Sequence, residues 1–174
     1  MMHRAIVKAT VVLAMSVGIT SCSPSPGDAA ASGAPAARAD AGTQLQKRHR
    51  ESGLPVIPLT LTSGGQAIEI SVEVARSRVE QAKGLMFRTE MGASEGMLFP
   101  FEEPREASFW MRNTVIPLDI IFVGTDCRIL NIEADAVPYS EDKRRSDGVA
   151  IAVLELNGGR AAELGIAPGD KVDW

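Results

Sequence analysis

Hydrophobic and polar residues alternate strictly in two neighbouring runs of the chain. Leu59 and Leu61 alternate with threonines, and apolar residues occupy every second position from Ile68 to Val74. Successive side chains of a β-strand point to opposite faces, so each run predicts a strand with one buried and one wet face. The Gly64-Gly65 pair between them favours a tight turn, and the two strands are therefore predicted to form a hairpin.

Two short helices are predicted from their end signals. Ser77 and Glu80 have the spacing of a capping box, in which each side chain satisfies the backbone amide of the other residue. Gly84 follows as a residue that can end this helix. A second helix is expected near the end of the chain, capped by Asn157 and stopped by Gly165.

Short apolar segments separated by turn residues make up the rest of the pattern. Val149 to Leu156 is apolar at nearly every position, which predicts a central buried strand. Residues 135–148 before it are charged and are expected to form a loop. Together the pattern predicts an α+β fold: a compact β-rich domain with about seven strands as a curled sheet or small barrel and two short helices. The further strands are expected at 96–101, 107–111, 115–123, 128–132 and 171–174.

The first 21 residues have the organisation of a secretory signal peptide. Basic residues precede an apolar run from Ala9 to Ile19, which is too short for a bilayer span of about 20 residues. The run ends in Ile-Thr-Ser-Cys and resembles a bacterial lipobox, so Cys22 is predicted to carry lipid. Ser23 resembles the residue that directs lipoproteins to the outer membrane. The predicted location is therefore the periplasmic side of the cell envelope, with the membrane as a partner through this lipid anchor.

Residues 22–53 are predicted to be the lipidated N-terminus and a disordered linker. Alanine, serine, proline and glycine fill 17 of the 21 positions from Ser23 to Thr43. Such a stretch cannot bury enough apolar surface to offset its ordering entropy. The basic cluster at 47–50 is either a solvated linker end or a contact for anionic lipid headgroups. The remaining residues, 54–174, are predicted to form one globular domain.

Composition narrows the chemistry of that domain. Residues 54–174 contain 12 basic and 19 acidic side chains, an excess that disfavours nucleic acid as a partner. Both histidines, His3 and His49, precede the domain, and Cys127 is its single cysteine. A Ser-His-Asp triad and a His/Cys metal cluster are therefore excluded from the domain, and the sequence predicts no metal or cofactor.

The most unusual stretch places polar residues among large apolar ones, from Phe109 to Asp119. A buried carboxylate needs a partner, so we expect Asp119 to pair with Arg112 or Arg88. One interpretation is a polar pocket floored by Trp110, and the other is a turn held by the same polar groups. Glu155, within the apolar strand 149–156, is a second carboxylate that needs a partner if it is buried. The candidate binding residues are Arg88, Trp110, Arg112, Asn113, Thr114, Asp119 and Glu155.

Several short motifs follow one another along the domain. They are Gly-Leu-Met-Phe-Arg at 84–88, Gly-Met-Leu-Phe at 96–99, Phe-Trp-Met-Arg-Asn-Thr at 109–114, Ile-Pro-Leu-Asp-Ile-Ile-Phe at 116–122, Val-Leu-Glu-Leu at 153–156 and Gly-Asp-Lys-Val at 169–172. In this order they resemble the family called domain of unknown function 192, over about residues 57–174. The resemblance implies a compact, β-rich α+β fold. It implies no established activity, and no catalytic residues follow from it.

Three interpretations of the function compete on these observations. We expect an envelope lipoprotein that acts as a binding or accessory module, for a small molecule, a glycan or an envelope protein. The alternative is a hydrolase of cell-envelope glycans that uses carboxylates alone. That chemistry requires Asp119 and Glu155 to face one cleft.

A third interpretation is a copper site built from methionine sulfurs. Thioethers suit Cu(I), although methionine is also a common filler of protein cores. The candidate sulfurs belong to Met86, Met91, Met97 and Met111.

Overall fold

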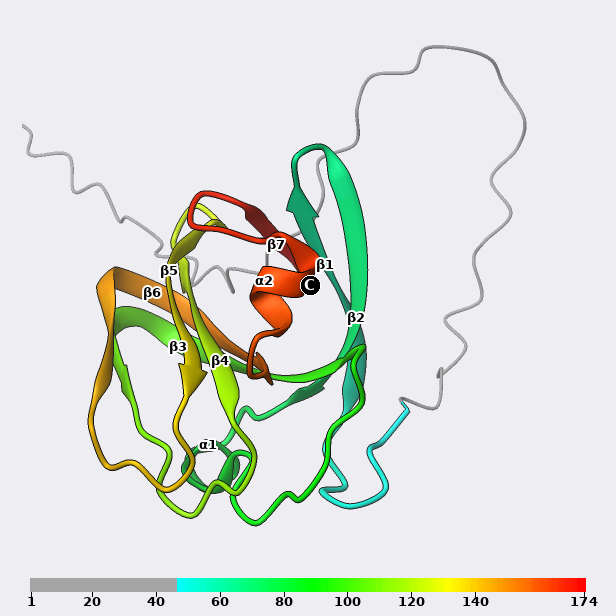
Figure 1. The fold of residues 1–174 in the computed structure, drawn as a ribbon, viewed down its shortest axis with the longest axis vertical. Coiled ribbons are helices and arrows are strands. Elements are labelled where there is room, and N and C mark those ends of the chain that lie inside the picture. The colour runs from blue at the N-terminus through cyan, green and yellow to red at the C-terminus, as the bar shows by residue number, and fades with distance from the viewer. Residues whose placement is uncertain (1–46) are drawn as a thin grey trace, which may run out of the picture.

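The computed structural model describes residues 47–174, which form one strongly curled sheet with two short helices (Figure 1). The predicted signal peptide and the predicted lipidation site Cys22 lie outside the described residues. Neither helix of the described part is long and apolar enough to cross a membrane. The elements are β1 (Val56–Ser63), β2 (Gln66–Val74), α1 (Arg78–Lys83), β3 (Glu95–Phe109), β4 (Leu118–Gly124), β5 (Ile129–Ala136), β6 (Arg144–Asn157), α2 (Arg160–Leu164) and β7 (Lys171–Asp173).

The sheet has the strand order β5-β4-β6-β3-β2-β1-β7 and curls until its two edges meet at one end. Arg128, just before β5, forms an isolated bridge with Lys171 of β7. Beside it the amide of Ile129 donates to the carbonyl of Asp170 at 2.9 Å. The prediction of a β-rich domain with a curled sheet and two short helices is confirmed in outline, and the domain is mainly sheet.

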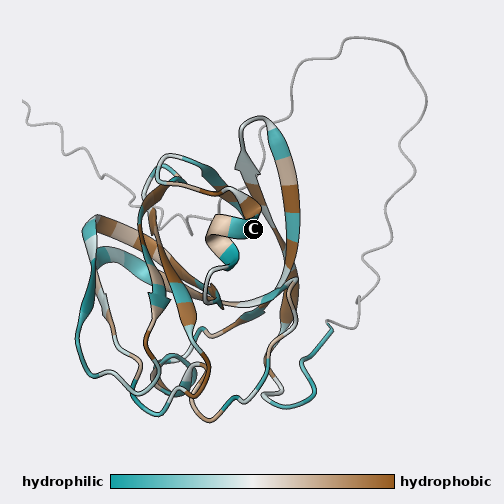
Figure 2. Cartoon of the chain, viewed as in Figure 1, coloured by the Kyte–Doolittle hydropathy of each residue, from teal (hydrophilic) through white to brown (hydrophobic). Residues whose placement is uncertain are grey.

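The predicted N-terminal hairpin is present. Leu59 pairs with Ile70 and Leu61 with Ile68, so the apolar positions of β1 and β2 share one face. The ribbon of β2 changes between teal and brown along its length, as alternation requires (Figure 2). After α1 the chain returns as β3, which runs parallel to β2.

The capping box of α1 is also present. The hydroxyl of Ser77 accepts from the amide of Glu80 at 3.2 Å, and the carboxylate of Glu80 accepts from the amide of Ser77 at 2.8 Å. The carboxylate also accepts from the amide of Arg76 at 2.9 Å, and the bonds from Ser77 and Arg76 lower the pKa of Glu80. The sequence signal was reliable here because both partners lie within one turn of the helix.

Strands β4 and β6 divide the interior into two apolar clusters. Leu154 and Leu156 of β6 belong to the first cluster, with Leu59 and Leu61 of the hairpin. Val153, on the other face of β6, belongs to the second. The second cluster also holds Leu85, Met97, Phe99, Met111, Ile120 and Phe122. Because side chains alternate along β6, Glu155 points to the side of the second cluster.

Two predicted boundaries were wrong. The separate strands expected at 96–101 and 107–111 are one strand, β3, whose pairing with β6 shifts between Pro100 and Arg105. The charged loop expected at 135–148 is shorter, because β6 already begins at Arg144. In both cases exposed charged residues continue a strand beyond the core, where the backbone ladder rather than burial holds it.

The predicted cap of the second helix was also wrong. Gly159 occupies the N-cap position of α2 and has no side chain to cap it. The side chain of Asn157 instead donates to the carbonyl of Met91 at 2.8 Å. Gly165 ends the helix in the left-handed conformation, as predicted.

Residues 47–53, at the end of the predicted linker, lie on the domain. The amide of His49 donates to the carbonyl of Leu54 at 2.9 Å, and the amide of Val56 donates to the carbonyl of Lys47 at 2.7 Å. Arg48 adds a hydrogen bond from its guanidinium to the carbonyl of Gly53 at 2.8 Å. These bonds give the chain a fixed entry point onto the sheet.

Candidate functional site

A pocket of about 280 Å³ lies at the end of the molecule where α1 is labelled in Figure 1. It is formed where the end of α1, the second half of β3 and the following turn meet the face of β6. Four of the seven predicted site residues line it: Trp110, Arg112, Thr114 and Glu155. The other side chains that give it its character are Lys83, Met86, Phe99, Arg105 and Phe109.

Glu155 lies on the buried side of this pocket. Its residue is only 5% exposed, and its neighbours across the sheet are Met97 on β3 and Ile120 on β4, both fully buried. Within residues 47–174 its carboxyl makes no hydrogen bond and no ion pair. Burial raises the pKa of Glu155 to about 8. At neutral pH the group is therefore mainly an uncharged acid that faces a cavity.

The exposed side of the pocket carries aromatic and basic groups. Trp110 is 42% exposed, and the guanidinium carbon of Arg112 lies 5.6 Å from the centre of its ring. Arg105 lies over the ring of Phe101 at 4.1 Å. Both contacts are cation–π geometries, which restrict the flexible arginine side chains. Among residues 47–174, Arg112 has one weak ionic neighbour, Glu141, with 3.8 Å between Nε and Oε1.

Hydrogen bonds connect three loops near the pocket, and each loop contains a residue with an unusual backbone conformation. Phe87, Asn113 and Tyr139 all have positive φ, of 65°, 57° and 61°. The amide of Phe87 donates to the carbonyl of Asn113 at 2.8 Å. The amide of Tyr139 donates to the carbonyl of Thr114 at 3.1 Å. Left-handed backbone is costly for non-glycine residues and gathers at functional sites.

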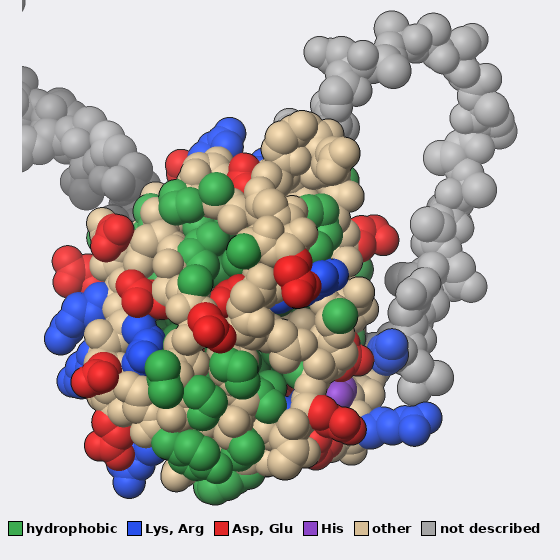
Figure 3. Space-filling model, viewed as in Figure 1, with side chains coloured by type: hydrophobic (Ala, Val, Ile, Leu, Met, Phe, Trp, Pro, Cys, Tyr) green, Lys and Arg blue, Asp and Glu red, His purple; other side chains and the backbone are tan. Residues whose placement is uncertain are grey.

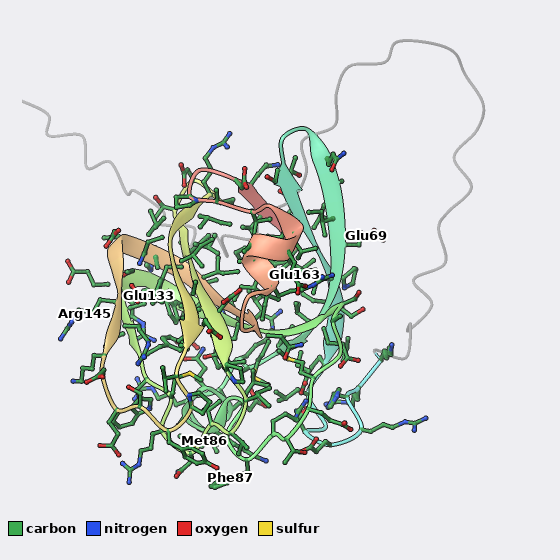
Figure 4. All side chains as sticks on the ribbon, viewed as in Figure 1. Glu69, Met86, Phe87, Glu133, Arg145 and Glu163 are labelled. Carbon is green, nitrogen blue, oxygen red and sulfur yellow. The ribbon has the colours of Figure 1, made fainter. Side chains whose placement is uncertain are left out.

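The same loops expose large apolar side chains. Phe87 is 66% exposed and Tyr139 is 61% exposed. Hydrophobic side chains gather at the lower end of the view in Figure 3, where Figure 4 labels Met86 and Phe87. Met86 lines the pocket and Phe87 follows it in the chain, so an exposed apolar side chain lies next to the pocket wall.

The remaining residues of the 109–114 motif have mixed roles. Thr114 is buried, and its hydroxyl makes a long hydrogen bond to the carbonyl of Arg112, at 3.4 Å. Asn113 does not line the pocket, and its side-chain amide contacts the sulfur of Met86 at 3.7 Å. Asn113 thus contacts Met86 in the pocket wall but does not itself face the pocket.

Asp119 is a structural residue, and the expectation that an arginine pairs with it was wrong. Its carboxylate is fully buried and accepts three backbone hydrogen bonds. The donors are the amides of Asp135 at 2.8 Å, Gly159 at 2.9 Å and Ala161 at 2.7 Å. Two of these amides belong to the start of α2, so Asp119 supplies the cap that the helix lacks in its own sequence.

The side chain of Arg88 also has a structural role, because it pairs with carboxylates outside the pocket. Its guanidinium makes a two-pronged contact with Glu73, at 2.9 and 3.2 Å, and its Nε lies 3.1 Å from Glu51. Burial alone would lower the pKa of Arg88, but the hydrogen bonds and charges of these carboxylates raise it. His49 and Ser52 also contact Glu73. Arg88 therefore fastens residues 49–52 to the domain rather than lining the Glu155 pocket.

The sequence analysis missed the basic and apolar residues around Glu155. Lys83 and Arg105 carry no local pattern that separates them from ordinary surface cations. Phe99 and Phe109 are 10 residues apart on one long strand, and their rings meet edge to face at 5.1 Å. The phenylalanines lie in two of the motifs quoted above, which was the one available signal.

The four methionines take part in packing. Met97 and Met111 are fully buried in the second cluster, and Met91 packs against it. The sulfur of Met86 contacts Asn113. Among residues 47–174, no three His, Cys, Asp or Glu side chains are grouped as a metal site would require.

The protein is thus a small β-rich domain with a curled sheet and, at one end of it, a pocket that contains the buried carboxyl of Glu155. The chain belongs to the family called domain of unknown function 192, described as "Uncharacterized ACR", which it matches over residues 59–174. No curated protein matches the chain.

Two solved structures are similar to it. The first is a protein of unknown function from Novosphingobium aromaticivorans DSM 12444, with 54% identity and a TM-score of 0.73, covering 82% of this chain and 100% of that chain. The second is described as a putative transcription regulator from Sinorhizobium meliloti 1021, with 38% identity and a TM-score of 0.67, covering 69% of this chain and 94% of that chain.

Proposed function

We propose that this protein is a ligand-binding module of the bacterial cell envelope and that its ligand enters the pocket above Glu155. The N-terminal signal pattern and Cys22 support a lipid anchor, and the predicted linker would let the domain reach away from the membrane. The pocket volume of about 280 Å³ is just below the usual range of about 300–1,000 Å³ for ligand sites, which suits a small polar molecule.

The observation that carries the proposal is a carboxyl that faces a cavity and has no hydrogen-bond partner within residues 47–174. Polar groups inside native proteins are nearly always hydrogen-bonded, so a carboxyl left open to a cavity needs a reason. Glu155 has apolar neighbours on both adjacent strands and a cavity in front of it. A ligand that hydrogen-bonds to this carboxyl supplies the reason.

The energetic cost of Glu155 supports the same conclusion. A pKa raised from 4.5 to about 8 corresponds to a stability loss on the order of 3 kcal/mol at pH 7. An apolar side chain of similar size would avoid that loss. Natural proteins accept such costs chiefly at functional sites.

The hydrolase of envelope glycans receives no support from the carboxylate geometry. Asp119 pairs across the sheet with Leu156, and Glu155 pairs with Ile120. Leu156 and Ile120 belong to different apolar clusters, so the two acids lie on opposite faces of the sheet. Paired-carboxylate cleavage needs both groups around one bond.

A nucleic-acid role is not favoured either, although one relative is described as a putative transcription regulator. Residues 54–174 carry 19 acidic and 12 basic side chains, which repel a phosphate backbone overall.

Ligand binding can be tested by thermal unfolding of the full chain against a library of sugars, amines, organic acids, phosphates and amino acids. A ligand at 100 times its Kd should stabilise the protein by about 2.7 kcal/mol. Glu155→Gln should abolish the shift. Glu69→Gln, which removes an exposed carboxylate of β2, should not (Figure 4). A screen without any Glu155-dependent ligand would refute the binding role.

The envelope location needs a separate experiment. Metabolic labelling with a fatty-acid analogue should mark the wild-type chain and leave Cys22→Ser unlabelled. Inhibition of the lipoprotein signal peptidase should accumulate the longer precursor. Equal labelling of both chains would contradict the predicted anchor.

A further inference from the structure

The two ends of the Glu155 pocket differ in chemistry, and this difference restricts the ligand. The inference rests on the proposed binding function and names the class of molecule bound. The buried end presents one carboxyl among apolar groups, whereas the exposed end presents cations.

The buried end suits an ammonium group. The carboxyl of Glu155 has no donor among the described residues, and an ionised carboxylate in apolar surroundings needs an opposite charge. Phe99 and Phe109 line the same cavity, and aromatic rings attract a desolvated cation. A neutral amide or hydroxyl could hydrogen-bond to the uncharged acid, but only an ammonium group gains charge attraction when the carboxyl ionises.

The exposed end suits an anionic group. Lys83, Arg105 and Arg112 all line the pocket. Lys83 has no ion pair within residues 47–174, and Arg112 has only the contact of 3.8 Å with Glu141. Arginine and lysine without close carboxylates are available to bind a carboxylate or phosphate.

No hydrogen bond or ion pair joins Glu155 to Lys83, Arg105 or Arg112 within residues 47–174, although all four line one pocket. The cause of the raised pKa of Glu155 is burial, with no lowering contribution from the three cations. A nearby cation would favour the ionised form. A ligand with two charged groups could therefore pair with both ends of the pocket at once.

We propose that the pocket binds an amphoteric small molecule, with its ammonium group on Glu155 and its carboxylate or phosphate on Lys83, Arg105 and Arg112. The chemistry is shared by free amino acids, amino phosphates and the zwitterionic headgroups of phospholipids. Phe87 and Tyr139 are exposed next to the lining residues, because Phe87 follows Met86 in the chain and the amide of Tyr139 donates to the carbonyl of Thr114.

Isothermal titration of the full chain with matched probes tests the proposal. O-phosphoethanolamine and 4-aminobutyrate carry both charges, whereas ethanolamine carries only the amine, and methyl phosphate and butyrate only the anion. At least one amphoteric probe should bind more than 10-fold more tightly than its single-charge counterparts. Glu155→Gln and the double variant Lys83→Gln/Arg112→Gln should each weaken binding at least 10-fold, and Glu69→Gln should leave it unchanged.

Proton release gives a readout that a merely structural role of Glu155 would not produce. At pH 7 an empty pocket holds about 0.9 proton on a carboxyl of pKa about 8. Pairing with an ammonium ionises the carboxyl and releases this proton to the buffer. The binding enthalpy should then change with the ionisation enthalpy of the buffer, in the wild type and not in Glu155→Gln.

Two further measurements distinguish a free ligand from a lipid headgroup, and a wrong ligand class from the absence of a binding site. Binding to vesicles of phosphatidylethanolamine, with no binding of the free probes, would assign the site to a lipid headgroup. Failure of free probes and vesicles alike would overturn the ligand class. If the library screen then returned a Glu155-dependent ligand without an amine, the pocket would stand as a binding site and only the amphoteric class would fall.

Discussion

Asp119 and Glu155 occupy neighbouring positions on paired strands and yet face opposite sides of the sheet. Asp119 is saturated by three backbone amides, whereas Glu155 faces a cavity without a protein partner in the described chain. Two acids that look alike in the sequence thus have separate roles. One holds the fold together, and the other is the centre of the candidate site.

The stability of the protein should fall as the pH rises from about 4.5 to about 8. In this range the unfolded chain has released the proton of Glu155, while the folded chain retains it because its pKa is raised. The loss is about 1.4 kcal/mol per pH unit and ends above the folded pKa. Glu155→Gln should therefore match the wild type in urea unfolding at pH 4.5 and exceed it by several kcal/mol at pH 8. A difference independent of pH would contradict the assignment.

Removal of the Asp119 carboxylate should destabilise the fold strongly. Asp119→Ala leaves three amides without acceptors, and each unsatisfied buried group costs about 1–3 kcal/mol. We expect a loss of at least about 3 kcal/mol in chemical denaturation. Glu163→Gln, on the exposed side of the same helix (Figure 4), should cost less than about 0.5 kcal/mol. Equal effects of the two substitutions would rule out the capping role.

The Arg88–Glu73 pair should show strong coupling. Breaking a buried ion pair on one side leaves an uncompensated charge, so Arg88→Met should cost about 3–5 kcal/mol. Adding Glu73→Met should recover part of this loss, because the orphaned carboxylate is then removed as well. A double-mutant cycle on unfolding free energies measures the coupling, and additive effects would show that the contact contributes little.

Ligand binding should change the fluorescence of one tryptophan. Trp110 lines the pocket, whereas Trp174 packs against the first apolar cluster. Trp174→Phe should retain the emission change that accompanies binding, and Trp110→Phe should lose it. A signal that follows Trp174 instead would place the ligand elsewhere on the domain.

Hydrogen exchange of the backbone amides in residues 49–52 tests whether Arg88 holds this segment on the domain. Glu51 contacts Arg88, and the amide of His49 bonds to Leu54. Arg88→Met should therefore speed hydrogen exchange at the amide of His49, while that of Leu61 in the hairpin stays protected. Unchanged exchange at His49 would mean that the backbone bonds alone hold this segment.

The local features of this protein could be predicted from the sequence. The hairpin 59–74 follows from alternation, the cap of α1 from Ser77 and Glu80, and the end of α2 from Gly165. Each depends on residues that are close in the chain, so backbone geometry links them directly. The choice of Trp110, Arg112, Thr114 and Glu155 as candidates also came from local contrast, as polar or large residues within or beside apolar runs.

Which of those candidates lie together depends on long-range packing. Arg88 finds Glu73 rather than Asp119, and Asp119 caps a helix 42 residues further along the chain. The pocket acid is Glu155 because β6 pairs with β4 in one particular register. A shift of that register by one residue would exchange the two faces. Alternation along a strand is visible in a sequence, but the side of the sheet on which a given residue falls depends on every strand packed around it.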